Sequence, residues 1–166
     1  MRMDIALRPI EKADLTQAAA IWNDVVAAAD SFPGDMILSE DEAWEMFCAQ
    51  TETVCAVKGD EVVGVYILHP NNIGRCAHIA NASYAVKAGA RGQGIGRRLV
   101  EDCLERAKKH GFRGLQFNAV VASNTAAIAL YLKLGFKVLG TVSGGYRDKD
   151  GHYRDTLIFL KTVAEE

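Results

Sequence analysis

A glycine-rich segment between a predicted strand and a predicted helix constrains the fold more than any other part of the chain. Residues 86–111 read VKAGARGQGIGRRLVEDCLERAKKHG, with four glycines and three arginines between Gly89 and Arg98. An amphipathic pattern follows directly and predicts a helix that begins near Gly94 and ends at Gly111. The first turn of a helix carries unpaired N–H groups and a partial positive charge, and glycine lets an anion approach them. The segment therefore predicts a phosphate-binding site, unless its glycines only let the helix pack closely on a sheet.

The pattern of apolar and turn residues predicts alternating strands and helices along the whole chain. Asp14 and Ser39 are expected to cap two helices, and Glu42 stands at capping-box spacing from Ser39. The predicted elements are a strand over 3–10, helices over 14–29 and 39–50, a hairpin over 53–68 turning at residues 59–60, a strand over 78–86, a helix over 94–110, a strand over 114–121, a helix over 124–134, and strands over 136–142 and 152–160. We expect one domain over residues 1–166, of the α/β class, with a single mixed sheet and helices on its faces.

Composition narrows the classes of function. The formal net charge of −2 argues against a general nucleic-acid-binding surface. No apolar run has the length of a membrane span, and the first residues lack the apolar stretch of a signal peptide. The four cysteines are too widely spaced for a metal site or a redox motif, so we expect reduced, mostly buried thiols in a cytoplasmic protein and no bound metal.

Two common phosphate-binding patterns do not fit the glycine cluster. A P-loop would need Gly-Lys-Ser/Thr, which does not follow at the required spacing. In a dinucleotide fingerprint that starts at Gly92, the third glycine would fall at position 97, which is Arg97. The cluster also follows several strands instead of opening the first strand–helix turn. A nucleoside-triphosphate site and a Rossmann site are therefore disfavoured.

A third pattern does fit. Residues 91–96, RGQGIG, match the Arg/Gln-x-x-Gly-x-Gly/Ala signature of the GCN5-related N-acetyltransferases. Further along, ASNTAAIALYLKLGFKVLG resembles that family's second signature, Asn-x-x-Ala-x-x-x-Tyr-x-x-x-Gly-Phe, through Asn124, Ala127, Tyr131, Gly135 and Phe136. The predicted order of elements is also that family's order. The resemblance implies the GNAT fold, with a central sheet splayed at its middle, and an enzyme that transfers an acetyl group from acetyl-CoA to an amine.

The resemblance also implies which residues bind the cofactor. The strand before the glycines is similar to the family strand that pairs with the pantetheine arm, and the glycine loop to the one that holds the pyrophosphate. Tyr131 is the expected general acid near the sulfur, although its helical spacing also suits a core tyrosine. The expected coenzyme A contacts are Tyr84, Ala85, Val86, Arg91, Gly92, Gln93, Gly94, Ile95, Gly96, Arg97, Arg98, Asn124, Ala127 and Tyr131.

The general base is less clear, because the strand AHIANASYAV carries no acid where family members often have a glutamate. His78 is the candidate, since an unperturbed histidine titrates in the useful range. Asp155, Tyr146 or a water chain are the alternatives. No cysteine is well placed for an acetyl-enzyme, so we expect direct transfer in a ternary complex.

The acceptor site is expected between two strands that each contain an asparagine, Asn81 and Asn118. Each side chain either makes a satisfied internal hydrogen bond or contacts a carboxylate or an amine of the acceptor. The pair also resembles the fungal azetidine-2-carboxylate N-acetyltransferases, which implies a small amino acid or a toxic proline analogue as acceptor.

Other walls of the acceptor site are expected from the N-terminal helices and from the last hairpin. Trp22 and Phe32 could line the site or belong to the core, and Tyr146 could reach the acceptor or lie in an exposed hairpin. The loop 30–35 could act as a lid. A homodimer is expected from the resemblance. A non-catalytic acyl-CoA sensor and a protein acetyltransferase are the rival functions.

Overall fold

A computed structural model describes residues 4–165, and the predicted order of strands and helices is confirmed. The elements are β1 (Ile5–Pro9), α1 (Leu15–Ala28), α2 (Glu40–Cys48), β2 (Glu52–Lys58), β3 (Glu61–Pro70), β4 (Ile79–Val86), α3 (Ile95–Lys109), β5 (Gly114–Val121), α4 (Thr125–Lys133), β6 (Lys137–Arg147) and β7 (Tyr153–Thr162). Among residues 4–165, none of the helices combines the length and apolar character needed to cross a bilayer.

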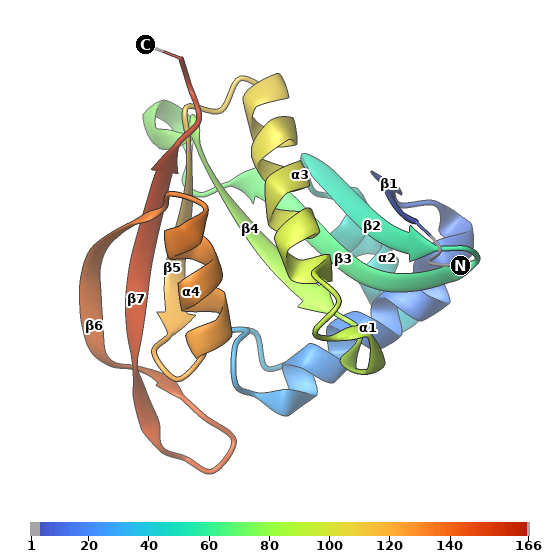
Figure 1. Cartoon of the computed structure of the whole chain (residues 1–166). Helices are drawn as coiled ribbons and strands as arrows, with labels where there is room; N and C mark the ends of the chain where they lie inside the picture. Colours follow the sequence, from blue (N-terminus) through green and yellow to red (C-terminus); the bar gives the residue numbers. More distant parts are fainter. Residues whose placement is uncertain (1–3, 166) are drawn as a thin grey trace.

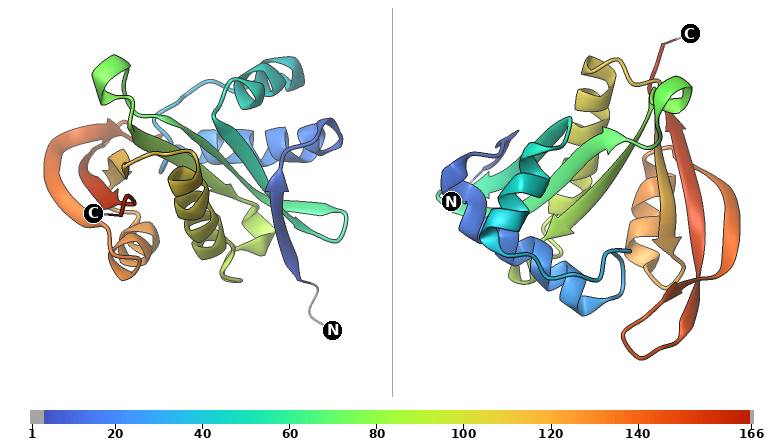
Figure 2. Two further views of the ribbon diagram at one scale, coloured as in Figure 1. Left: turned by 90° about the horizontal axis from the view of Figure 1, so that it is seen from above. Right: turned by 180° about the vertical axis from the view of Figure 1, so that it is seen from behind.

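The strands form one seven-stranded sheet in the order β1-β2-β3-β4-β5-β7-β6. All neighbouring pairs are antiparallel except β4 and β5, which are parallel. Helices α3 and α4 cover one face, and α1 and α2 cover the other (Figures 1 and 2). The fold is thus the predicted mixed α/β sheet with helices on both faces.

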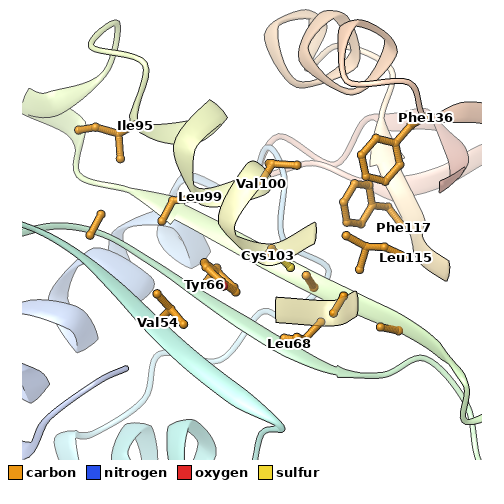
Figure 3. Close-up of a cluster of buried hydrophobic side chains, with 14 of the residues drawn as sticks. Val54, Tyr66, Leu68, Ile95, Leu99, Val100, Cys103, Leu115, Phe117 and Phe136 are labelled. Atoms are coloured by element: carbon orange, nitrogen blue, oxygen red, sulfur yellow. The ribbon is translucent and has the colours of Figure 1, made fainter. Parts of the chain in front are cut away.

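Each face of the sheet has its own hydrophobic core. On the α3 face, side chains from β2, β3 and β5 pack against α3, and Tyr66, Leu99 and Leu115 are fully buried (Figure 3). On the other face, α1 and α2 bury an apolar stripe that includes Trp22 and Phe47. Burial of this kind stabilises a domain by about 25 cal/mol for each Å² of apolar surface removed from water.

The sheet splays at its middle, as the resemblance implied. Strands β4 and β5 pair only at Ile79 with Gly114 and at Ala80 with Leu115. Beyond these pairs the two strands diverge, which Figure 1 shows below the labels β4 and β5. The gap leaves one edge of β4 without a neighbouring strand.

The backbone direction of β4 follows from the bonds at its start. The carbonyl of His78 accepts from the N–H of Arg113, on the β5 side, whereas the carbonyl of Ile79 accepts from the N–H of Asn71, at the end of β3. Because the two sides alternate along a strand, the even-numbered residues of β4 direct their N–H groups toward β5. Past the last β4–β5 pair, these residues are Ala82, Tyr84 and Val86.

Three local predictions need correction. Asp14 stands at the start of α1 but does not cap it, because its carboxylate accepts from the backbone N–H of Glu11 at 2.8 Å and from Arg8 at 2.7 and 3.0 Å. Strand β6 continues through residues 143–147, which the sequence suggested as a loop. Only Cys55 and Cys103 are buried, whereas the other two cysteines are exposed.

Candidate active site

A cavity of about 680 Å³ lies where β4 and β5 diverge. It receives walls from five parts of the chain, so it exists only because the sheet is splayed. The lining residues are Val25 and 30–33 from α1 and the following loop, 81–84 and 86 from β4, 90–92, 94–96 and 100 from the glycine segment and α3, 117–121 from β5, and 123, 124, 126, 127, 130 and 131 from the start and body of α4.

The glycine segment forms one end of this cavity. Gly92 and Gly94 have φ angles of 79° and 76°, a left-handed conformation that disfavours any other residue. A Cβ added at either position would meet no atom within 4 Å. The glycines are therefore not needed for close helix packing, and the space beside them is available to a ligand.

The first turn of α3 presents N–H groups at this end. Helix α3 has fifteen residues, and its first N–H groups at Ile95, Gly96 and Arg97 precede the first intrahelical bond. The N–H of Arg98 donates to the carbonyl of Gly94 at 3.2 Å, so it is used by the helix and is not available to a phosphate. The partial positive charge of the helix end and the adjacent Arg91 side chain both favour a pyrophosphate at this position.

Four residues of the predicted cofactor set lie outside the cavity lining, namely the buried Ala85 and three exposed residues. Gln93, Arg97 and Arg98 are exposed. The Nε atom of Arg97 donates to Glu101 at 2.7 Å, so this arginine is part of a surface ion pair. Their contact with coenzyme A stays a prediction.

The free edge of β4 supplies the second polar wall. Tyr84 and Val86 line the cavity, and the alternation described above directs their N–H groups into the splay. Ala85 has the opposite orientation and is buried in the core beneath α1. The expected pairing with an extended ligand arm therefore falls to Tyr84 and Val86.

The Tyr84 side chain adds an unexpected feature. Its hydroxyl is buried and has no hydrogen-bond partner among the described residues. Burial raises the pKa of this hydroxyl well above its ordinary value, so it is a neutral donor. This oxygen lies beside the buried Cys103 thiol and is not accessible from the cavity, so the hydroxyl belongs to the core beneath α3.

Tyr131 reaches the cavity from α4. Its ring packs against Phe117 with centroids 4.5 Å apart, and against Phe136 and Phe159 at 5.5 Å each. Burial, followed by the nearby Cys103, raises the pKa of the Tyr131 hydroxyl well above 10, so the group stays protonated at neutral pH. Because packing fixes the ring and the hydroxyl keeps its proton, Tyr131 is suited to donate a proton.

Asn124 and Ala127 complete the α4 wall. The Oδ1 atom of Asn124 accepts from the N–H of Ala127 at 3.4 Å, which confirms the predicted cap of α4. Both residues line the cavity.

The predicted acceptor residues separate into two groups. Asn81, Asn118 and Phe32 line the cavity. Trp22 belongs to the core, where its ring contacts Phe32 at 4.7 Å. The Tyr146 hydroxyl donates to the carbonyl of Phe32 at 2.9 Å, so this tyrosine fastens the loop after α1 instead of lining the cavity.

The predicted base lies elsewhere. His78 is exposed and precedes β4 at the end where β4 and β5 are still paired, and it does not line the cavity. The Oδ1 atom of Asp155 accepts from Gly144 within the β6–β7 hairpin, also outside the lining. Asp30 is the acidic residue among those that line the cavity. The sequence had shown it only as the first residue of a possible lid.

Asn71 is a polar residue of the site that no pattern in the sequence indicates. Its Oδ1 atom accepts from the Nδ2 atoms of Asn81 at 3.1 Å and of Asn118 at 2.7 Å. It follows the last residue of β3 in the segment PNN, which resembles any polar turn. Only the spatial contact with the other two asparagines identifies it.

Known proteins share this architecture. A family model described as acetyltransferase (GNAT) family matches residues 20–136. The N-acetyltransferase aca1 of Schizosaccharomyces pombe is 29% identical over 156 residues, which cover 82% of this chain and 74% of the yeast protein. A GCN5-related N-acetyltransferase from Kribbella flavida is 34% identical, with 95% of this chain and 97% of that chain covered and a TM-score of 0.88. A GNAT superfamily phosphinothricin acetyltransferase from Sinorhizobium meliloti, solved in complex with AcCoA, is 23% identical, with 96% and 89% covered and a TM-score of 0.88, and shows the same fold.

The matched model spans more than half of the sequence, and the chain belongs to the acetyltransferase (GNAT) family. It is an N-acetyltransferase that uses acetyl-CoA. The glycine segment and the N–H groups on the free edge of β4 fit such an elongated, phosphate-bearing molecule.

Proposed function

We propose that this enzyme acetylates the amine of a small molecule, an amino acid or a toxic proline analogue, within the splay between β4 and β5. The observation that carries the proposal is that two sets of groups line the same cavity. One set, at the start of α3 and along β4, suits acetyl-CoA, and the other, Asn81, Asn118 and Phe32, remains for an acceptor. The relationship to a phosphinothricin acetyltransferase supports an amino-acid-like acceptor.

The loop after α1 supports a small acceptor over a protein. Residues 30–33 line the cavity, and the Tyr146 hydroxyl fastens this loop to the β6–β7 hairpin. Figures 1 and 2 show the loop extending from α1 toward the lower ends of β5 and β7. A bridge between these two elements restricts the room for a bound peptide.

Acetyl-CoA supplies the acetyl group as a thioester. The N–H groups at the start of α3 would hold its phosphates, and those of Tyr84 and Val86 would align its arm. We propose that the Tyr131 hydroxyl gives its proton to the departing thiolate. We propose direct transfer, because none of the four cysteines is among the residues that line the cavity.

We propose that Asp30, not His78, takes up the proton of the acceptor amine, directly or through water. Asp30 is among the residues that line the cavity, whereas His78 is not. Asp30→Asn is expected to lower kcat/KM about 100-fold without weakening acetyl-CoA binding. His78→Ala is expected to leave both quantities unchanged, and the reverse pattern would return the role to His78.

An acceptor panel tests the proposed function. Release of the coenzyme A thiol is measured with azetidine-2-carboxylate, proline, phosphinothricin, common amino acids, polyamines and a lysine peptide, and without acceptor. Release confined to the small amino acids supports the proposal. Release with the peptide alone would show a protein acetyltransferase, and binding of acetyl-CoA without release would favour an acyl-CoA sensor.

We further propose one acetyltransferase domain over residues 1–166, located in the cytoplasm and assembled as a homodimer. The four free cysteines suit a reducing compartment. Strand β6 is an edge of the sheet and exposes Val138, Leu139 and Val142, with exposed fractions of 45%, 56% and 45%. Such an apolar edge favours pairing with another chain. Sedimentation velocity should give a dimer mass, and a monomer at micromolar concentration would contradict this assembly.

A further inference from the structure

Asn71 joins the two strands that diverge around the cavity. Its backbone N–H donates to the carbonyl of Ile79 at 2.8 Å, which fixes the residue beside the start of β4. Its side-chain oxygen accepts from Asn81 on β4 at 3.1 Å and from Asn118 on β5 at 2.7 Å. One oxygen thus connects two strands at the point where their own pairing has ended.

The orientation of these amides follows from a backbone donor. The N–H of Ala82 faces the splay and donates to Oδ1 of Asn81 at 2.7 Å. The other amide atom of Asn81 is therefore nitrogen, which requires an acceptor, and the facing atom of Asn71 is therefore oxygen. That oxygen in turn requires a nitrogen from Asn118, whose own oxygen accepts from Gln116 at 3.1 Å.

The result is a donor-rich pair of amides on the cavity wall. The oxygens of Asn81 and Asn118 already accept from protein donors, whereas each nitrogen uses one hydrogen on Asn71 and retains a second. Asn118 also lies in a β-bulge, because the β5–β7 register shifts between Phe117 and Val120. Bulges of this kind turn a side chain toward a site.

We propose that Asn71 is a positioning residue that turns the amides of Asn81 and Asn118 so that their N–H groups receive an anionic group, a carboxylate, of the acceptor. Two converging neutral donors match the two oxygens of a carboxylate, and they would not favour a cation. This inference rests on the proposed small-molecule function and names the part of the acceptor that is recognised.

Three variants test this role. Asn71→Ala removes the shared acceptor but keeps the backbone bond to Ile79. Asn71→Asp keeps oxygens for both amides but adds a negative charge beside the proposed carboxylate. Asn72→Ala is the matched control, because the neighbouring Asn72 is exposed and its Oδ1 atom accepts only from Ile73 among the described contacts. Circular dichroism confirms that each variant is folded.

The first readout needs no acceptor. The side-chain NH₂ signals of Asn81 and Asn118 are followed by ¹⁵N–¹H NMR, with assignment by single substitution of each residue. Asn71→Ala should shift both signals and speed their exchange with water about tenfold or more, whereas Asn72→Ala should change neither. Unchanged signals in Asn71→Ala would overturn the proposed arrangement.

The second readout compares azetidine-2-carboxylate with its carboxamide as acceptors. Asn71→Ala should raise KM for the acid about tenfold with kcat and the KM for acetyl-CoA preserved. Asn71→Asp should lower the preference for the acid over the amide about tenfold, because like charges repel. Shifted NMR signals with unchanged acceptor KM values would overturn the positioning role. If the native enzyme acetylates neither compound, the proposed acceptor class fails, and the NMR result still decides the arrangement around Asn71.

Discussion

Gly94→Ala tests whether the glycine before α3 serves only the backbone conformation or also leaves room for the pyrophosphate. At this position φ is 76°, and an added Cβ would meet no protein atom within 4 Å. The only cost to the free protein is therefore the left-handed backbone of an alanine, about 1–2 kcal/mol. In a domain of this size that loss lowers Tm by roughly 2–8 °C.

Binding of acetyl-CoA should respond more strongly, because the methyl group projects into the space assigned to the pyrophosphate. Loss of one hydrogen bond to a charged group costs about 1.5–3 kcal/mol, which corresponds to a roughly 10- to 100-fold higher Kd. Isothermal titration calorimetry with acetyl-CoA measures Kd, and differential scanning calorimetry measures Tm.

Two matched variants make the result decisive. Gly111→Ala carries a similar backbone strain at the other end of α3, with φ of 80° and equally free space, so it should lower Tm alike and leave Kd unchanged. Gly96→Ala has no positive φ, and its position accepts alanine in the family signature, so it should preserve both quantities. Equal Kd values for Gly94→Ala and Gly111→Ala would refute the phosphate cradle.

Three further predictions concern the acid, the lid and the fold. Tyr131→Phe should lower kcat about 100-fold with an unchanged Kd for acetyl-CoA, because the ring keeps its packing and only the proton donor is lost; an unchanged kcat at every pH would exclude this acid. Tyr146→Phe should raise the acceptor KM several-fold and speed proteolysis of the loop after α1, since the bond to the Phe32 carbonyl contributes about 1 kcal/mol; equal digestion rates would contradict the lid. Asp14→Ala should lower the free energy of unfolding by about 1–3 kcal/mol at pH 7. The hydrogen bond from Arg8 holds the pKa of Asp14 below its usual value. The difference in the free energy of unfolding between the native protein and Asp14→Ala, measured by urea titration, should therefore disappear only as the pH falls below about 4. A difference that persists at pH 2 would contradict the ion pair.

Local signals in the sequence predicted most of the fold. Strand alternation, the Ser39–Glu42 capping box and the glycines that end α3 and α4 are interactions between near neighbours, and all are present. The cap at Asp14 failed because an arginine in β1 competes for the same carboxylate. The extended end of β6 was missed because its glycines resemble a loop, whereas pairing with β7 keeps them in a strand.

The sequence predicted those site residues that belong to a contiguous motif. It did not predict those that reach the site only through tertiary contacts. The glycine segment and Tyr131 line the cavity as expected from contiguous patterns. His78 and Tyr146 could not be placed from sequence, because the divergence of β4 from β5 and the path of the loop after α1 decide which side chains face the cavity. In the sequence, Asn71 belongs to an ordinary polar turn, and only the folded structure places it beside Asn81 and Asn118.

We propose that acetyl-CoA and a small amine meet in the splay between β4 and β5. The most direct test is a single incubation of the enzyme with ¹³C-labelled acetyl-CoA and an equimolar mixture of amino acids, azetidine-2-carboxylate, polyamines and a lysine peptide, followed by mass spectrometry of all products. The expected result is one or a few labelled N-acetyl amino acids, with no label on the protein, and their loss in Tyr131→Phe. Label confined to the peptide, or retained on the enzyme itself, would contradict it.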